Sequence, residues 1–241
     1  MLDLDMREPL FDYIEQFYGK IRVFEEKTTG RSRADVIGII DGAFIGFEIK
    51  SDGDSYARLK TQTRDYDQLC DINYIVVGES HRRHASEHVP GHWGVLCVFE
   101  REDGIHVEMD QVPAINPQAR LARQLGFLWR PELASLLEMN HMPKYAWESK
   151  AFVQQKLMEK VPPELLKRQI TDMLFERDYD LLLAEIERVK KARECARKER
   201  ARAASKSKRR ARKTASGIAA KAAQRPADKI AGKSAKRRTR Q

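Results

Sequence analysis

The sequence predicts an α/β fold with a mixed sheet, followed by a helical region and a basic tail. Two β-branched runs joined by Asp41-Gly42 indicate a hairpin, because Asp-Gly between such runs favours a two-residue turn of type I′. Apolar positions at helical spacing precede the hairpin. A second helical segment and the continuous apolar run Tyr74-Ile-Val-Val77 follow it. This order indicates a βαβ crossover and therefore a parallel strand pair.

A helix and a strand are expected before the hairpin. Apolar residues at positions 10, 11, 14, 17 and 18 stop at Gly19, which predicts a helix over residues 6–18. The segment Ile21-Arg-Val-Phe-Glu25 predicts the first strand. Asp5 and Glu8 have the spacing of a helix capping box, which gives Glu8 a purely structural interpretation.

The hairpin has a predicted register. With a two-residue turn at positions 41 and 42, the numbers of paired residues sum to 83, which places Asp35 opposite Glu48 and Arg33 opposite Lys50. Opposed carboxylates repel at Cβ separations of roughly 4.5–5.5 Å, and a cation would offset that repulsion. Glu48 and Lys50 share a face because strand side chains alternate. Two carboxylates and a lysine are therefore expected to converge.

These residue types suit phosphodiester hydrolysis. Carboxylate oxygens are ligands for a hard cation such as Mg²⁺, which proteins commonly hold with one or two carboxylates and substrate phosphate. An ammonium group beside them orients a water molecule and offsets charge on phosphoryl oxygens. The alternative is a solvated hairpin face on which Asp35, Glu48, Arg33 and Lys50 neutralise one another.

The pattern Asp35…Glu48-Ile-Lys50 resembles the signature of the PD-(D/E)xK nucleases, the restriction-endonuclease-like superfamily. Ala34 stands where that pattern has Pro, at a position without chemistry. Gln62 and Tyr66 resemble the Q-x-x-x-Y motif of the RecB-like branch. Over residues 5–160 the chain is similar to uncharacterised bacterial and prophage-encoded members. Further segments that carry the resemblance are Arg7-Glu-Pro-Leu10, Tyr74-Ile-Val-Val-Gly78, His92-Trp-Gly94 and Leu128-Trp-Arg-Pro-Glu132.

The resemblance implies an αβββαβ core and a metal-dependent nuclease acting on DNA with Mg²⁺ or Mn²⁺. It implies that Asp35, Glu48 and the Ile49 carbonyl hold the metal ion, with Glu8 of the first helix as an additional carboxylate. It also implies that Lys50 assists the attacking water.

The Q-x-x-x-Y resemblance implies that Gln62 and Tyr66 position substrate and orient Lys50. These residues belong to a helix expected to begin near Ser51 and Asp52, in which positions 54, 58, 62 and 66 form one stripe. In the alternative interpretation, Asp54 and Arg58 form an ordinary ion pair and Tyr66 packs on the sheet.

The rest of the chain divides into three predicted parts. Residues 93–99 and 105–109 predict a second hairpin, which completes a core over residues 1–115. Apolar spacing predicts helices within 119–138, 149–158, 163–177 and 179–190. They form a helical extension, residues 116–190, that packs on the core. Residues 191–241 form a basic tail that is expected to be largely disordered.

Charge is distributed unevenly along the chain. Residues 188–241 contain 22 of the 45 Lys and Arg residues and only three acids, a net charge of +19, which leaves −10 on residues 1–187. Basic terminal segments commonly bind nucleic acid through phosphates. The residues expected to contact nucleic acid are Arg33, Arg58, Lys206, Lys208, Arg209, Arg210, Arg212 and Lys213.

Composition excludes several classes of protein. Cys70, Cys97 and Cys195 are odd in number and lack C-x-x-C spacing, which argues against a disulfide framework and against a zinc site. The N-terminal residues lack the features of a signal peptide, and no stretch of ~18 apolar residues predicts a membrane span. A cytoplasmic location, with nucleoid association left open, is expected.

Several alternatives stay open. A catalytically inactive nucleic-acid-binding or adaptor protein with the same fold would also carry the basic tail. RNA is an alternative substrate to DNA, and a homodimer is compatible with the sequence. Endonuclease and exonuclease action are not distinguished, and neither is the biological pathway, whether defence, recombination or repair.

Overall fold

The structure is a computed structural model that describes residues 1–29, 32–181, 183, 184, 186–188, 190, 191, 194–200, 202 and 203. Contacts divide the chain into two units, residues 1–183 and 184–241, which are described separately. The six Lys and Arg residues between 206 and 213 that were expected to bind nucleic acid lie outside the described residues. The predicted part boundaries after residues 115 and 190 stay predictions.

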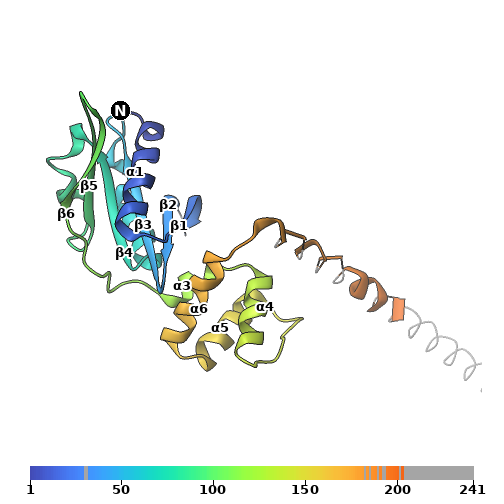
Figure 1. Cartoon of the computed structure of the whole chain (residues 1–241). Helices are drawn as coiled ribbons and strands as arrows, with labels where there is room; N and C mark the ends of the chain where they lie inside the picture. Colours follow the sequence, from blue (N-terminus) through green and yellow to red (C-terminus); the bar gives the residue numbers. More distant parts are fainter. Residues whose placement is uncertain are drawn as a thin grey trace, which may run out of the picture. The chain divides into compact units, whose positions relative to one another are not determined.

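The first unit contains one sheet and six α-helices with bounds in these described residues (Figure 1). The α-helices are α1 (Asp3–Tyr18), α2 (Leu59–Leu69), α3 (Leu121–Gly126), α4 (Arg130–Met139), α5 (Lys150–Lys160) and α6 (Pro163–Phe175). The strands are β1 (Arg22–Thr29), β2 (Ser32–Ile40), β3 (Ala43–Lys50), β4 (Ile72–Gly78), β5 (Gly94–Arg101) and β6 (Gly104–Gln111). Short 3₁₀ helices are η1 (Tyr56–Arg58), η2 (Glu79–His81) and η3 (Ala85–His88).

The six strands form a mixed sheet in the order β1-β2-β3-β4-β5-β6. The pairs β3–β4 and β4–β5 are parallel, and the other neighbours are antiparallel. Helix α2 connects the parallel strands β3 and β4, as the apolar run of β4 predicted. The α/β prediction with a mixed sheet is therefore confirmed.

Apolar side chains bury both faces of the sheet. On one face, Met6, Leu10 and Ile14 of α1 pack with residues such as Phe47 and Val76. On the other face, residues of α2 join side chains of α3 to α6 in a larger cluster. Figure 1 shows α1 lying along the sheet and α3 to α6 gathered at one end of it. The helical region thus shares a core with the sheet.

The turn of the hairpin is not the predicted type I′. That turn needs positive φ at both central residues, whereas in this turn only Gly42 has one, at 69°. The backbone N–H of Gly42 donates to the Thr171 hydroxyl of α6 at 3.1 Å. A contact with a distant helix therefore helps to fix this turn, which local sequence preferences cannot anticipate.

The described residues of the second unit are helical. Glu194 and Lys198 form an i,i+4 ion pair at 2.8 Å, as expected for an exposed helix of this composition. No helix in the part of the chain that the structure describes is both long and apolar enough to cross a membrane.

Candidate active site

Strands β2 and β3 separate where the two predicted carboxylates lie. The pairing follows the predicted register over the five residue pairs nearest the turn. The pairs expected next, Asp35 with Glu48 and Arg33 with Lys50, do not form. The prediction of register is confirmed, but its extension to the carboxylates is wrong.

A tyrosine hydroxyl from α2 occupies the place where the strands separate. The Tyr66 hydroxyl accepts the backbone N–H of Asp35 at 2.9 Å and donates to the carbonyl of Phe47, also at 2.9 Å. The Asp35 carboxylate in turn accepts the Ile49 backbone N–H at 2.9 Å through Oδ2. These side chains satisfy backbone groups that a continuous ladder would otherwise pair. They also tie the Asp35 carboxylate to β3, next to Glu48.

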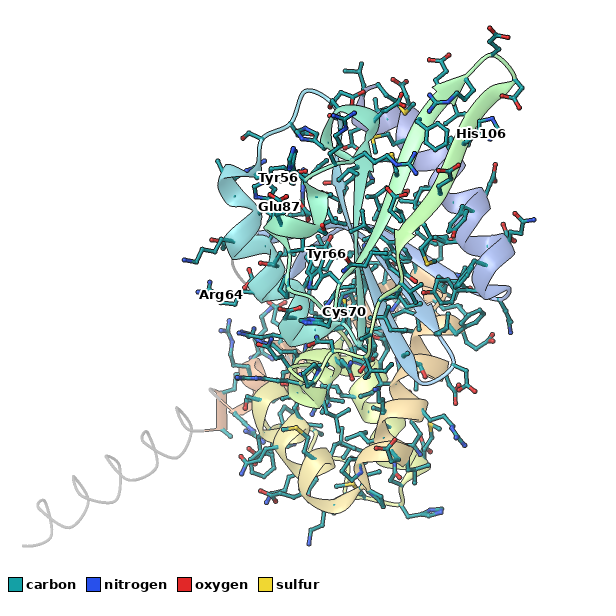
Figure 2. All side chains as sticks on the ribbon, turned by 90° about the vertical axis from the view of Figure 1, so that its left-hand side faces the viewer. Tyr56, Arg64, Tyr66, Cys70, Glu87 and His106 are labelled. Carbon is teal, nitrogen blue, oxygen red and sulfur yellow. The ribbon has the colours of Figure 1, made fainter. Side chains whose placement is uncertain are left out.

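Tyr66 is fully buried, which favours the alternative interpretation over the implied contact with substrate. Its ring packs edge-on against Trp93, with ring centroids 5.7 Å apart. A Cβ atom at Gly46 would lie 2.3 Å from the Tyr66 ring, so this close approach to β3 requires glycine. Figure 2 shows Tyr66 inside the molecule and Arg64 of the same helix pointing outward. Tyr66 is therefore a positioning residue that packs on the sheet, as the alternative interpretation expected.

Glu48, Lys50 and Gln62 meet beneath α2. The Lys50 ammonium group bonds Oε1 of Glu48, and it lies 3.4 Å from the Ile49 carbonyl and 3.4 Å from Oε1 of Gln62. All three side chains are buried, Glu48 completely. Oε2 of Glu48 is buried without a hydrogen-bond partner. An unsatisfied carboxylate oxygen is costly in such a place, and a cation bound there would remove that cost.

Burial changes the acidity of both carboxyl groups. Burial, and then repulsion from Asp35, raises the pKa of Glu48 to about 7, although Lys50 opposes the change. Burial likewise raises the pKa of Asp35, against the effects of the Ile49 N–H and Lys50. Such shifts are typical of functional sites as well as of buried structural groups.

The site opens to solvent through a hollow of about 360 Å³ beside Asp35. Gln62 lines this hollow, together with Arg33 of β2 and Arg58 at the start of α2. The Arg33 side chain is 66% exposed and pairs with Glu26 at 2.5 Å. Both arginines thus lie at the opening, where they could reach a substrate. That they contact nucleic acid stays a prediction.

The helix that carries Gln62 begins later than expected. Asp54 precedes it and accepts the backbone N–H and hydroxyl of Ser51 at 2.9 and 2.6 Å. Of the predicted stripe, Gln62 and Tyr66 lie in α2 and Arg58 is its N-cap residue. The hydrogen bonds given for the Asp54 carboxylate come from Ser51 and not from Arg58.

Glu8 does not join the site. It is exposed and lines a hollow between α1 and β6 with residues such as Asp12 and His106, whereas Glu48 points to the other face of the sheet, beneath α2. The helix begins at Asp3 with Leu2 as its cap residue, so the capping-box interpretation of Glu8 is also wrong. The helix starts a turn earlier than predicted, because Asp5 accepts the Leu2 backbone N–H at 2.9 Å.

Sequence reasoning missed Arg7 of α1. Its largely buried guanidinium bonds Asp3 at 3.0 and 3.1 Å, Glu25 at 2.8 Å and Glu26 at 3.0 Å. Glu26 has a positive φ of 53° and lies where β1 and β2 lose one residue pair, beside Asp35. The signal was present in the sequence, because a charged residue on the apolar face of a helix needs carboxylate partners.

The donor set of Asp35, Glu48 and the Ile49 carbonyl fits a hard divalent cation. All three groups offer oxygen, and Oε2 of Glu48 is buried with no other partner. No cluster of three or more His, Cys, Asp and Glu side chains suited to a metal ion occurs in the described ranges. An Mg²⁺ ion here would therefore rely on the carbonyl, water and substrate phosphate for its remaining ligands.

Comparison with known proteins gives a family. A family model described as bacteriophage P4 protein cII matches residues 15–211. The chain belongs to this family. No curated protein sequence matches it.

One solved structure resembles this cII-family protein weakly. It is the structure of Pyrococcus furiosus SfsA in complex with Ca²⁺, with 13% sequence identity and a TM-score of 0.30. The match covers 48% of this chain and 62% of the SfsA chain. At this level the likeness carries no argument about function.

From the raised pKa of Glu48 we predict how the stability of the metal-free protein depends on pH. The folded chain keeps the Glu48 proton up to a pH of about 7, whereas an ordinary glutamate loses it near 4.5. The free energy of unfolding should therefore fall as pH rises from about 4.5 to about 7. Glu48→Gln removes the part of this dependence that is due to Glu48 and leaves the part that is due to Asp35. Above pH 7 the variant should therefore be more stable than wild type, and this difference should shrink as pH falls toward 4.5.

Urea unfolding in EDTA across this pH range measures the difference in the free energy of unfolding between wild type and Glu48→Gln. Adding Mg²⁺ at about 100 times its Kd should stabilise wild type by about 2.7 kcal/mol but not the variant. Asp12→Asn, an exposed carboxylate on α1, is the matched control. An equal response of both variants to Mg²⁺ would contradict a metal site at Glu48.

Proposed function

We propose that this protein is a metal-dependent nuclease that hydrolyses DNA phosphodiester bonds, as a member of the PD-(D/E)xK superfamily. The observation that carries the proposal is the grouping of Asp35 with the buried Glu48 and Lys50, behind an opening that Asp35 and two arginines line. One oxygen of Glu48 is buried without a hydrogen-bond partner. A buried carboxylate oxygen of this kind is available to a cation, and an ion or water bound to it would remove the cost of its burial.

Each residue has a distinct role in this proposal. Asp35 and Glu48, with the Ile49 carbonyl, would hold Mg²⁺ or Mn²⁺. When bound, the cation supplies an acidified water and neutralises phosphate charge. Lys50 would hold the attacking water and offset charge on the phosphoryl oxygens, while Gln62, 3.4 Å away, orients its ammonium group.

The remaining residues act around this centre. Tyr66 fixes the Asp35 backbone through its hydroxyl and does not contact substrate. Arg33 and Arg58 line the opening, where guanidinium groups can hold the substrate phosphates on either side of the cleaved bond.

The proposal is tested by incubating the full chain with labelled single-stranded, duplex and branched DNA, and with RNA, in Mg²⁺, Mn²⁺ or EDTA. We expect cleavage of DNA that requires the divalent cation. No cleavage of any substrate would favour the catalytically inactive binding protein. Cleavage confined to RNA would favour a ribonuclease.

A separate prediction concerns the contribution of the basic tail to DNA binding. Removing residues 205–241, which lie outside the described residues, should weaken DNA binding while metal-dependent cleavage persists. The reason is that nonspecific phosphate contacts raise local concentration without supplying chemistry. Binding measured against salt concentration checks this, since the truncated chain should show a clearly shallower dependence than the full chain. Loss of cleavage at saturating substrate would show that the tail does more than bind.

A further inference from the structure

A second hollow lies along α2, beyond the candidate active site. It encloses about 340 Å³ between β1, α2, α3 and α5. Leu69 and Phe127 provide apolar surface, and the polar groups belong to Thr28, Asp65, Gln68, Arg123 and Gln154. The Asp65 carboxylate accepts the backbone N–H and the hydroxyl of Ser32 through Oδ2, at 2.8 and 2.9 Å. A partly apolar space of this size with a few polar groups is typical of a small-ligand site.

The two hollows follow one flank of α2. Residues 57, 58, 61 and 62 line the first hollow, and residues 65, 68 and 69 line the second. Steps of three and four residues keep these positions on one side of a helix. At a rise of 1.5 Å per residue, Gln62 and Gln68 are about 9 Å apart along the axis. This is roughly the length of two to three stacked nucleotides at about 3.4 Å each.

The side chains of the second hollow suit a base and its phosphate. Arg123 is exposed. Its Nε and one terminal nitrogen donate hydrogen bonds to Oε1 of Gln68 at 3.2 and 2.9 Å, which fixes the guanidinium group at the rim of the hollow. These two contacts use Nε and one terminal nitrogen of Arg123, so the N–H groups of the other terminal nitrogen can meet a phosphate. Phe127 offers an aromatic ring, on which any base can pack.

We propose that the hollow between Leu69, Arg123 and Phe127 binds one nucleotide of a single-stranded nucleic acid that extends along α2 from the active site. The inference rests on the proposed function, because it places the cleaved bond in the first hollow. A base that enters the second hollow must be unpaired, so the bound strand is single-stranded and not part of a duplex.

Gly126 is a position at which a side chain can be added beside the hollow. It lines the hollow, and a Cβ atom built there has no atom within 4 Å. Gly126→Trp should therefore occupy the space meant for the base, while Gly126→Ala leaves most of it open. For a labelled oligothymidylate in EDTA, we expect Gly126→Trp to weaken binding about fivefold or more relative to Gly126→Ala, the size of one stacked base.

Arg123 tests the phosphate contact independently. Arg123→Ala should weaken binding of the same oligonucleotide and reduce the salt slope by about one. The matched control is Arg64→Ala, an equal change of charge on α2 at a side chain that points to solvent (Figure 2). We expect its effect to stay below twofold.

The outcomes separate this inference from the proposed function. Equal binding by Gly126→Trp and Gly126→Ala, or equal weakening by Arg123→Ala and Arg64→Ala, would overturn the subsite even if wild type cleaves DNA. An equal loss of affinity for a duplex of the same length would overturn the single-strand assignment. Because binding is measured in EDTA, a chain that never cleaves can still support the subsite.

Discussion

Glu48→Gln is expected to reduce metal-dependent DNA cleavage on the order of 10³-fold or more. The reason is that a divalent cation needs the carboxylate charge at this buried position. Because the amide of glutamine is nearly the same size as the carboxylate, the substitution changes the charge and little else. Metal binding requires ionised carboxylates, so at Mg²⁺ concentrations below saturation cleavage by wild type should also decline as pH falls below about 7, the pKa of Glu48 in the metal-free protein.

This variant separates lost chemistry from lost folding. Most active-site substitutions leave both explanations open, but here the metal-free variant should be more stable than wild type above pH 7. Lys50→Met should reduce cleavage comparably, because it removes the ammonium group and keeps an apolar stem in place. Single-turnover cleavage rates at saturating Mg²⁺ provide the measurement.

Exposed residues of the same type provide the controls. Glu102→Ala in the turn between β5 and β6, and Lys144→Ala in the loop after α4, remove the same charges far from the hairpin in sequence. Both should cleave within about twofold of wild type. Wild-type rates in Glu48→Gln would refute the assignment of Glu48 as a metal ligand and, with it, the proposed mechanism.

Glu132→Ala is expected to destabilise the first unit by about 3–5 kcal/mol, because it leaves the Arg177 guanidinium buried without its counter-ion. The two side chains are 4% and 6% exposed. Nε of Arg177 lies 2.7 Å from Oε1 of Glu132, and a terminal nitrogen lies 2.8 Å from Oε2. Glu132 also accepts the Trp129 N–H at the start of α4 at 2.6 Å.

Aromatic rings surround the same guanidinium group. Its centre lies 5.5 Å from the rings of Phe24 and Trp129 and 5.9 Å from those of Phe127 and Tyr179. Arg177 therefore joins β1 to the helical region. The loss of Glu132 should also loosen Phe127, one wall of the second hollow, and so weaken oligonucleotide binding.

Urea unfolding provides this measurement, with Glu159→Ala as the control. Glu159 pairs with Lys156 at 2.6 Å on an exposed face of α5, and the loss of such a pair should cost less than about 1 kcal/mol. A double-mutant cycle with Arg177→Met isolates the interaction energy. If Glu132→Ala costs no more than Glu159→Ala, the buried pair does not hold the helical region to the sheet.

Much of the fold follows from local sequence. The apolar periods of α1 and α6, the continuous run of β4 and the Asp41-Gly42 turn are each signals within a single element. They predict the type of each element and the order of the elements along the chain, because hydrophobic period and turn chemistry act over a few residues. Element ends were less predictable, as the early start of α1 and the late start of α2 show.

The candidate site was predicted only in part. Spacing alone placed Asp35, Glu48 and Lys50 near one another, because strand register is set by a two-residue loop. The role of Tyr66 was not predictable, since its hydroxyl reaches between β2 and β3 from a helix later in the chain. The position of Glu8 depends on how α1 is rotated over the sheet.

The sequence by itself determined the order of the elements, the hairpin register and the residue types available for a metal site and for phosphate contacts. Only the tertiary structure decided that the hairpin opens at Asp35, that Oε2 of Glu48 is left without a partner and that Arg7 binds three carboxylates. The physical reason is the distance along the chain over which each property is set. Period and turn type are local properties, whereas burial and hydrogen-bond satisfaction depend on groups that the folded chain brings together from distant positions.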